Sequence, residues 1–253
     1  FSSIYKIMKL LFSYFSPLII LLNLVSTQLH AQEPNFTQFY AAPTYLNPAF
    51  TGAAPYYRIS ANYRKQWWNI SNTYETQTVG FEYQSDKWNS GFGLLAVQDR
   101  AGALGTKSTQ ISLLYSYKIR LSQEWVAHGA LQGTYGARSP NFSSFIFEDE
   151  LLTGGTTLEP QGASVHYFNL SSGIVAYNET YWFGVAVHNL LRPNQSIVNG
   201  SSPLPMHISV QSGMKLPIGY QAELAPALFF QKQGAFSQLD LGTNVHLGAF
   251  ITG

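Results

Sequence analysis

The chain has 253 residues, of which 11% are charged and 15% aromatic; its net charge is +1 and it has no cysteine. Ordinary soluble domains carry roughly 25% charged residues, and helical membrane proteins need several apolar runs of about 20 residues. The absence of cysteine excludes disulfides and thiolate metal sites, and the balanced charge gives no attraction to nucleic acid. A transmembrane β-barrel fits this composition, because its strands alternate lipid-facing apolar residues with polar residues of the lumen.

The first 31 residues differ from the rest. Two lysines precede an apolar run over residues 10–25, and a polar stretch follows Ala31. This order predicts a secretory signal peptide over residues 1–31, cleaved after Ala31. A membrane anchor is the alternative, although the run is short for a span and contains a proline and an asparagine.

Residues 32–56 are expected to form an N-terminal periplasmic segment or plug. Within them, QFYAAPTYLNPAFTG (residues 38–52) has no charge and alternates with neither the strand nor the helix period. Its two prolines each remove a ladder donor, so it cannot be a strand, and it is too apolar to lie free in water. We expect it to seal the periplasmic mouth, enter the lumen or bind a periplasmic partner; a passive plug is the alternative. The residues expected to contact the partner are Gln38, Phe39, Tyr40, Tyr45, Asn47, Pro48 and Phe50.

From residue 57 onward the sequence is typical of β-strands. Apolar and polar residues alternate with a period of two over 57–66, 77–83, 110–118, 207–216 and 238–247, which predicts half-buried strands. Weaker patterns add strands at 91–99, 124–137, 164–177, 180–190 and 220–231. We therefore expect an all-β fold, an antiparallel transmembrane β-barrel over residues 57–253. At least ten strands are visible; the usual closing strands are missing, so about 12 to 14 are expected in the complete protein.

The alternation also assigns side chains to the two faces of the barrel wall. Apolar residues such as Ile59, Phe81 and Val210 are expected to face lipid. Aromatic residues near strand ends match the girdles of membrane barrels; they are Trp67, Trp68, Trp88, Trp125, Tyr181 and Trp182. The polar residues expected to line the lumen are Arg58, Asn62, Arg64, Glu82, Lys118, Gln211, Asp240, Asn244 and His246.

The connections between the expected strands tend to alternate between long and short. Outer-membrane barrels have short periplasmic turns and longer external loops. This parity predicts that residues 138–163 and 191–205 are external and that 84–90 and 216–220 are periplasmic. The N-terminus is then periplasmic as well.

Motifs for catalysis or cofactor binding are scarce. No two histidines have metal-ligand spacing, and the chain has no G-x-S-x-G nucleophile elbow and no phosphate-binding glycine loop. We therefore expect no enzyme activity, no cofactor and no metal. A lipid-acting enzyme stays open as an alternative, because a Ser–His site can be assembled across strands without a local motif.

The region NFTQFYAAPTYLNPAFTGAAPYYRISANYRKQWW resembles the N-terminal signature of the PorP/SprF family of outer-membrane proteins. The matching residues are Glu33, Pro34, Phe36, Gln38, Phe39, Asn47, Pro48, Ala49, Gly52, Tyr63, Arg64, Gln66 and Trp67. Thr37 stands where the family usually has serine. Two later stretches, GLLAVQDRAGALG and VAVHNLLRPNQS, resemble further family segments, so the resemblance spans nearly the whole chain after the signal peptide.

This resemblance implies a non-enzymatic scaffold of type IX secretion and gliding motility in the outer membrane of Bacteroidota. Such a barrel would anchor either periplasmic motor and ring proteins or a large secreted surface adhesin, and the sequence does not choose between these partners. A small-solute channel is the alternative, because the expected lumen is polar.

Overall fold

The computed structural model describes residues 42–66, 74–101, 106–140, 164–196, 200–218, 222–247 and 250–252. The chain divides into two units, Phe1–Gln32 and Glu33–Gly253, and every described residue belongs to the second. The expected signal peptide therefore lies outside the described residues. So do Gln38, Phe39 and Tyr40 of the expected partner contact, and Trp67 and Trp68 of the expected girdle.

The described residues form one 12-stranded sheet. Its longer strands are β1 (Tyr57–Gln66), β2 (Tyr74–Ser85), β3 (Ser90–Ala101), β4 (Thr106–Arg120), β5 (Val126–Ser139), β6 (Val165–Tyr177), β7 (Tyr181–His188), β8 (His207–Met214), β10 (Ala222–Gln233) and β11 (Phe236–Leu247). Two short strands are β9 (Leu216–Ile218) and β12 (Phe250–Thr252). The helical elements are α2 (Pro43–Leu46) and the 3₁₀ turns η2 (Pro48–Phe50) and η3 (Asp86–Trp88).

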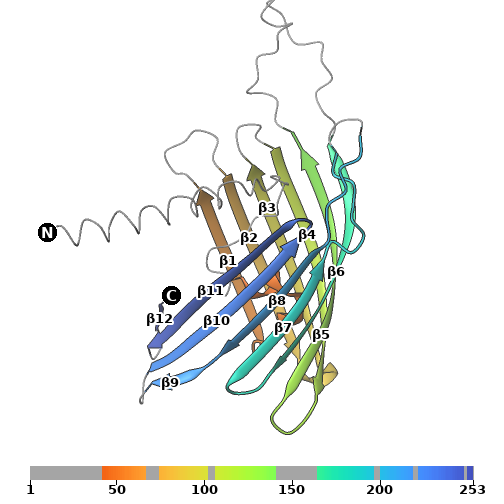
Figure 1. The fold of residues 1–253 in the computed structure, drawn as a ribbon. Helices are drawn as coiled ribbons and strands as arrows, with labels where there is room; N and C mark the ends of the chain where they lie inside the picture. The colour runs from red at the N-terminus through yellow and green to blue at the C-terminus, as the bar shows by residue number, and fades with distance from the viewer. Residues whose placement is uncertain are drawn as a thin grey trace, which may run out of the picture. The chain divides into compact units, whose positions relative to one another are not determined.

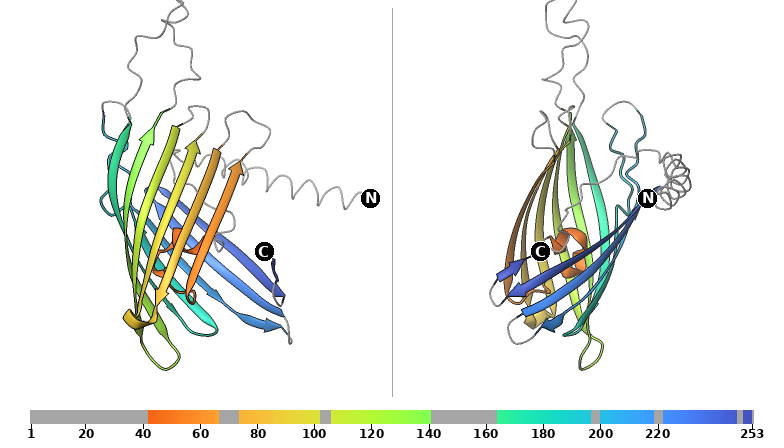
Figure 2. Two further views of the ribbon diagram at one scale, coloured as in Figure 1. Left: turned by 180° about the vertical axis from the view of Figure 1, so that it is seen from behind. Right: turned by 60° about the vertical axis from the view of Figure 1, so that its left-hand side comes forward.

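Pairing in the sheet is antiparallel throughout and follows the order of the chain. Each strand pairs with the next, except that β8 pairs with β10 directly and β9 pairs only with β10. The sheet curls, so that β8, β10 and β11 cross in front of β1–β4 in Figure 1. The helical segment before β1 lies on the concave side of this curve in both views of Figure 2. The expected all-β antiparallel fold is confirmed, with a strand at each of the ten expected places.

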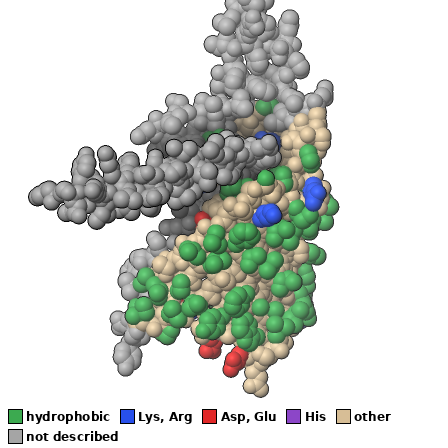
Figure 3. Space-filling model, in the orientation of Figure 1, with side chains coloured by type: hydrophobic (Ala, Val, Ile, Leu, Met, Phe, Trp, Pro, Cys, Tyr) green, Lys and Arg blue, Asp and Glu red, His purple; other side chains and the backbone are tan. Residues whose placement is uncertain are grey.

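The two faces of the sheet differ as the alternation predicts. In β2 the inward side chains of Thr76, Thr78 and Glu82 are buried, while Val79 and Phe81 between them are exposed on the outer face. Apolar side chains cover the outer face over β7, β8, β10 and β11 in Figure 3. A wall that is apolar outside and polar inside is the pattern of a transmembrane barrel.

No helix among the described residues is both long enough and apolar enough to cross a membrane.

Short turns gather at one end of the sheet. They are 86–89 after β2, 121–125 after β4 and 178–180 after β6. The side chain of Asn178 accepts hydrogen bonds from the backbone N–H groups of Thr180 and Tyr181 at 2.9 and 2.6 Å, an Asx turn that suits a tight connection. At the other end, residues 189–206 form a long connection between β7 and β8. The β10–β11 connection at that end is nevertheless a two-residue turn, with Gly234 at φ +59°.

Trp182 does not belong to an outer aromatic girdle. Consecutive residues of a strand face opposite sides, so Tyr181 is exposed on the outer face while Trp182 points inward. Its ring meets that of Phe50 edge to face, with centroids 5.6 Å apart. Trp88 and Trp125, in contrast, lie in the short turns.

Candidate functional site: the inner segment

The chain before β1 folds into two short helical turns that lie against the inner face of the sheet. We call residues 42–52 the inner segment. Pro43 begins α2 and Pro48 begins η2, which are positions where a missing N–H costs nothing. Asn47 joins the two turns: its backbone N–H closes α2 on Pro43 and its side-chain oxygen accepts from the N–H of Ala49 at 2.9 Å. The prolines that exclude a strand here therefore start helical turns.

Asn47 fixes the inner segment to β6, β7 and β8. Its Nδ2 donates to the carbonyl oxygens of Ile174 and Val185 at 3.3 and 3.2 Å, and to Oε1 of Gln211 at 3.1 Å. Gln211 in turn donates to Oγ of Ser209 at 2.7 Å. Asn47 and Gln211 are both 0% exposed. A buried amide with this many partners is stabilising only while all of them stay in place.

Two glycines leave the space that Asn47 occupies. A Cβ at Gly173 would lie 2.1 Å from Oδ1 of Asn47, and one at Gly184 would lie 3.1 Å from its Nδ2. Both distances are shorter than ordinary van der Waals contact. Glycine at these points of β6 and β7 is therefore explained by the close approach of the inner segment.

A second set of contacts fixes the end of the inner segment to β2 and β4. The carbonyl oxygen of Thr51 accepts from Oγ of Ser116 at 2.6 Å, and the N–H of Gly52 donates to Oε2 of Glu82 at 2.8 Å. Glu82 also forms an ion pair with Nε of Arg58. Gly52 has φ +71°, and a Cβ there would lie 2.6 Å from Cα of Gly91, so glycine is required on both counts.

Apolar contacts complete the attachment. Ala49 is fully buried against Ala130 and Val175, and Phe50 and Tyr177 pack against the same cluster. Tyr45 packs against a second buried cluster of Leu95, Val97 and Leu114, on β3 and β4. The segment thus binds the inner face through β2–β4 on one side and β5–β8 on the other.

The structure places the residues of the expected partner contact in two environments. Asn47 and Pro48 are fully buried between the segment and the wall, while Tyr45 and Phe50 are partly buried. These four lie together on one short stretch. Their role in binding a partner stays a prediction.

Most residues expected in the lumen have their side chains on the inner face. Glu82, Gln211 and Asn244 are buried, Asn62 donates to Oγ1 of Thr78 at 3.3 Å, and Asp240 accepts from Gln238 at 2.8 Å. Arg58, Arg64 and Lys118 are partly buried, as are Asn62 and Asp240. The side chain of His246 lies outside the described residues.

Two inner-face features were missed by the sequence analysis. The apolar cluster of Leu95, Val97 and Leu114 contradicts a uniformly polar lumen; the run LLAV, apolar on both faces of β3, was its signal. The second feature is a hydrogen-bonded group on β4 and β5, in which Gln132 donates to Oγ of Ser112 and Oγ1 of Thr134, each at 3.1 Å. No sequence signal marks that group, because its members meet only through strand register.

The described residues hold no group of three or more His, Cys, Asp or Glu side chains placed to bind a metal ion. What the site offers is a fixed peptide inside a sheet, with buried amide and carboxylate groups used to hold it.

Neither the curated proteins nor the solved structures contain a match to this chain. A family model does match, over residues 28–253: the type IX secretion system membrane protein PorP/SprF. That match covers the inner segment and the whole described sheet, and it confirms the resemblance drawn from the sequence. The chain is therefore a member of the PorP/SprF family of type IX secretion system membrane proteins.

Proposed function

We propose that the chain is a non-enzymatic outer-membrane scaffold of the type IX secretion and gliding machinery. Its N-terminus lies in the periplasm, its short turns face the periplasm, and its long connections face outward. The barrel gives a base held in lipid, which anchors either periplasmic motor and ring proteins at one end or a large secreted surface adhesin at the other.

The observation that carries this proposal is the inner segment. Hydrogen bonds from Asn47 and to Glu82 attach it to strands on both sides of the curved sheet. A peptide fixed in this way occupies the interior, and an occupied interior suits an anchor better than a pore.

Partner binding is assigned to the residues leading into the inner segment and to its partly buried aromatic side chains. Gln38, Phe39 and Tyr40 precede it directly, while Tyr45 and Phe50 are stiffened by Pro43 and Pro48. Aromatic side chains on a backbone with little freedom bind partners at low entropic cost.

A pull-down from mild detergent tests this assignment. The chain in which Phe39 and Tyr40 are changed to alanine should fold, migrate as a heat-modifiable barrel on gels, and lose its periplasmic partners as identified by mass spectrometry. Leu191→Ala removes an exposed apolar side chain from the opposite end and serves as the control. If the first variant retains every partner that the parent retains, docking through this stretch is wrong.

A small-solute channel is the second candidate, favoured by the polar group around Ser112, Gln132 and Thr134 on the inner face. Conductance in a planar bilayer separates the two functions. The scaffold should show little conductance until the inner segment is released, whereas a large stable conductance of the intact chain would establish the channel.

A further inference from the structure

Two basic side chains lie next to each other on the outer face, at the end of the sheet that carries the long connections. Arg100 of β3 and Lys107 of β4 are cross-strand partners in the register, and both are exposed. Like charges directly opposite each other destabilise a sheet. The neighbouring carboxylate, Glu75, lies opposite Arg100 in the register of β2 and β3, and it is paired with Lys65 at 3.1 Å. Within the described part of the chain, no carboxylate lies within ion-pairing distance of Arg100 or Lys107.

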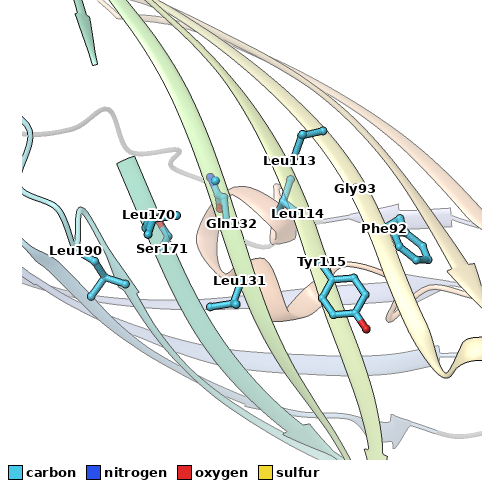
Figure 4. Close-up of a pocket in the computed structure, with 11 residues that line it drawn as sticks. Phe92, Gly93, Leu113, Leu114, Tyr115, Leu131, Gln132, Leu170, Ser171 and Leu190 are labelled. Atoms are coloured by element: carbon cyan, nitrogen blue, oxygen red, sulfur yellow. The ribbon is translucent and has the colours of Figure 1, made fainter. Parts of the chain in front are cut away.

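Below this pair, on the same face, the sheet carries an apolar groove of about 510 Å³. Its outward walls are Phe92, Leu113, Tyr115, Leu131, Leu170 and Leu190, which come from β3 to β6 and the start of the long connection after β7 (Figure 4). Leu113 and Leu131 are 70% and 65% exposed. Gly133 lies between Leu113 and Leu170 in the register and leaves the groove open at its centre.

The groove and the basic pair lie along one strand. Lys107, Ile111 and Leu113 all face outward on β4, and six residues of strand separate the first from the last, which is roughly 20 Å. This is comparable with the depth of one leaflet of a membrane whose hydrocarbon core is about 30 Å thick. The arrangement therefore matches a lipid, with an anionic head at the rim and acyl chains below.

We propose that Arg100 and Lys107 bind the phosphate of a membrane lipid whose acyl chains lie in the groove of β3–β6. The inference rests on the membrane placement in the proposed function, which puts this rim at the outer leaflet. Phosphate neutralises the two adjacent cations, and a guanidinium binds two of its oxygens in a fork. The outward walls are apolar side chains, which suit acyl chains.

Native mass spectrometry of the intact chain in detergent, with diphosphorylated lipid A as the probe, tests the proposal. The parent should retain bound lipid A. Arg100→Gln, Lys107→Gln should weaken retention by about 30-fold, as expected for two cations at an anionic lipid surface. Lys232→Gln is the matched control. It removes an exposed cation of β10 at the end of the sheet that carries the long connections. Lys232 has no basic neighbour in the register and lies away from the groove. It should retain lipid A as the parent does.

The groove has its own matched pair of variants. Gly133→Leu fills it, with only Phe168 at 3.5 Å from the new Cβ, whereas Gly129→Leu adds the same side chain to the same face of β5 with nothing within 4 Å. Only the first should reduce retention. Inorganic phosphate at the same concentration should not displace the lipid.

The proposal is overturned if the double variant retains lipid A like the parent, if Lys232→Gln loses it equally, or if free phosphate displaces it. Should the double variant fail to migrate as a folded barrel, Arg100→Gln alone gives the same comparison with a smaller loss. Partner co-purification, measured in parallel, reports on the scaffold function separately, so failure of one leaves the other standing.

Discussion

Asn47 and Gln211 are 164 positions apart in the chain, yet their side-chain amides lie 3.1 Å apart in the fully buried interior. The contact joins a residue of the N-terminal segment to β8, near the far end of the sheet. It makes the inner segment part of the wall rather than a loose insert.

Asn47→Ala should destabilise the protein by about 1–3 kcal/mol, because it leaves Gln211 and two buried carbonyl oxygens without this donor. Asn62→Ala removes a single hydrogen bond from a partly buried residue and should cost less than about 1 kcal/mol. Urea unfolding in detergent, followed by tryptophan fluorescence, measures both. Equal costs would contradict the structural role given to Asn47.

Gly173→Ala should displace the inner segment, because the added Cβ would lie 2.1 Å from Oδ1 of Asn47. Overpacking of this kind costs about 1–3 kcal/mol. The matched change on the outer face is Gly133→Ala, whose Cβ meets Phe168 at an ordinary 3.5 Å. Limited proteolysis should cut the segment before β1 in the first variant only; cleavage at the same rate in both would show that Gly173 is not needed for the fit.

Glu82→Gln should weaken the second attachment, because the buried carboxylate accepts from the N–H of Gly52 and pairs with Arg58. Arg58 is 35% exposed, so water limits the loss to about 1–3 kcal/mol. Glu75→Gln breaks the partly exposed pair with Lys65 and should cost no more than about 1 kcal/mol. Thermal unfolding of the two variants measures both losses of stability. A larger loss for Glu75→Gln than for Glu82→Gln would contradict the prediction.

Leu241→Arg should cost about 2–4 kcal/mol if the outer face contacts lipid, since Leu241 lies midway along β11 and is 76% exposed. Ser237→Arg, on the same face of β11 and level with Lys232, should cost at most about 1 kcal/mol. Folding into vesicles at a series of urea concentrations measures the difference. Two equal costs would mean that this face does not contact the membrane core.

The proposed orientation predicts which single cysteines can be labelled on intact cells. Ser201→Cys lies in the long connection before β8, and Lys87→Cys lies in the short turn after β2; both sites are exposed, and the chain has no other cysteine. A membrane-impermeant maleimide should label the first and not the second. Labelling of Lys87→Cys on intact cells would reverse the assignment.

Period-two alternation was enough to predict the strands and the outer face, because each strand has one side in a uniform apolar environment. Residues such as Val79, Phe81 and Leu239 can therefore be assigned to the outer face from their neighbours in the sequence. The inner face was harder to predict. Period-two alternation places Gln211 on the lumen side, where an arginine should be tolerated if the lumen is wide and aqueous. Gln211 is instead fully buried against Asn47, so Gln211→Arg should be costly.

The inner segment itself was only partly predictable. Its prolines and apolar side chains excluded a strand and a free coil, which left entry into the lumen among three alternatives. What no local pattern could supply was the set of contacts, since Asn47, Gly173 and Gln211 come together only through the curvature of the whole sheet. The side chain of Trp182 was likewise not predictable from its neighbours in the sequence. Its position near a strand end suggested an outer aromatic girdle, whereas the folded sheet turns it toward Phe50.

The sequence separations of the Asn47 contacts have a consequence for assembly. Its partners lie 127, 138 and 164 residues later in the chain, so these hydrogen bonds can form only once β6, β7 and β8 are present. Contacts between residues so far apart in the sequence form slowly, because the chain between them must be ordered first. Until β5–β8 are in place, the segment has only its attachment to β2–β4, through Gly52–Glu82, Thr51–Ser116 and the contact of Tyr45 with the Leu95 cluster. We therefore expect the segment to dock on β2–β4 before β6–β8 pair around it.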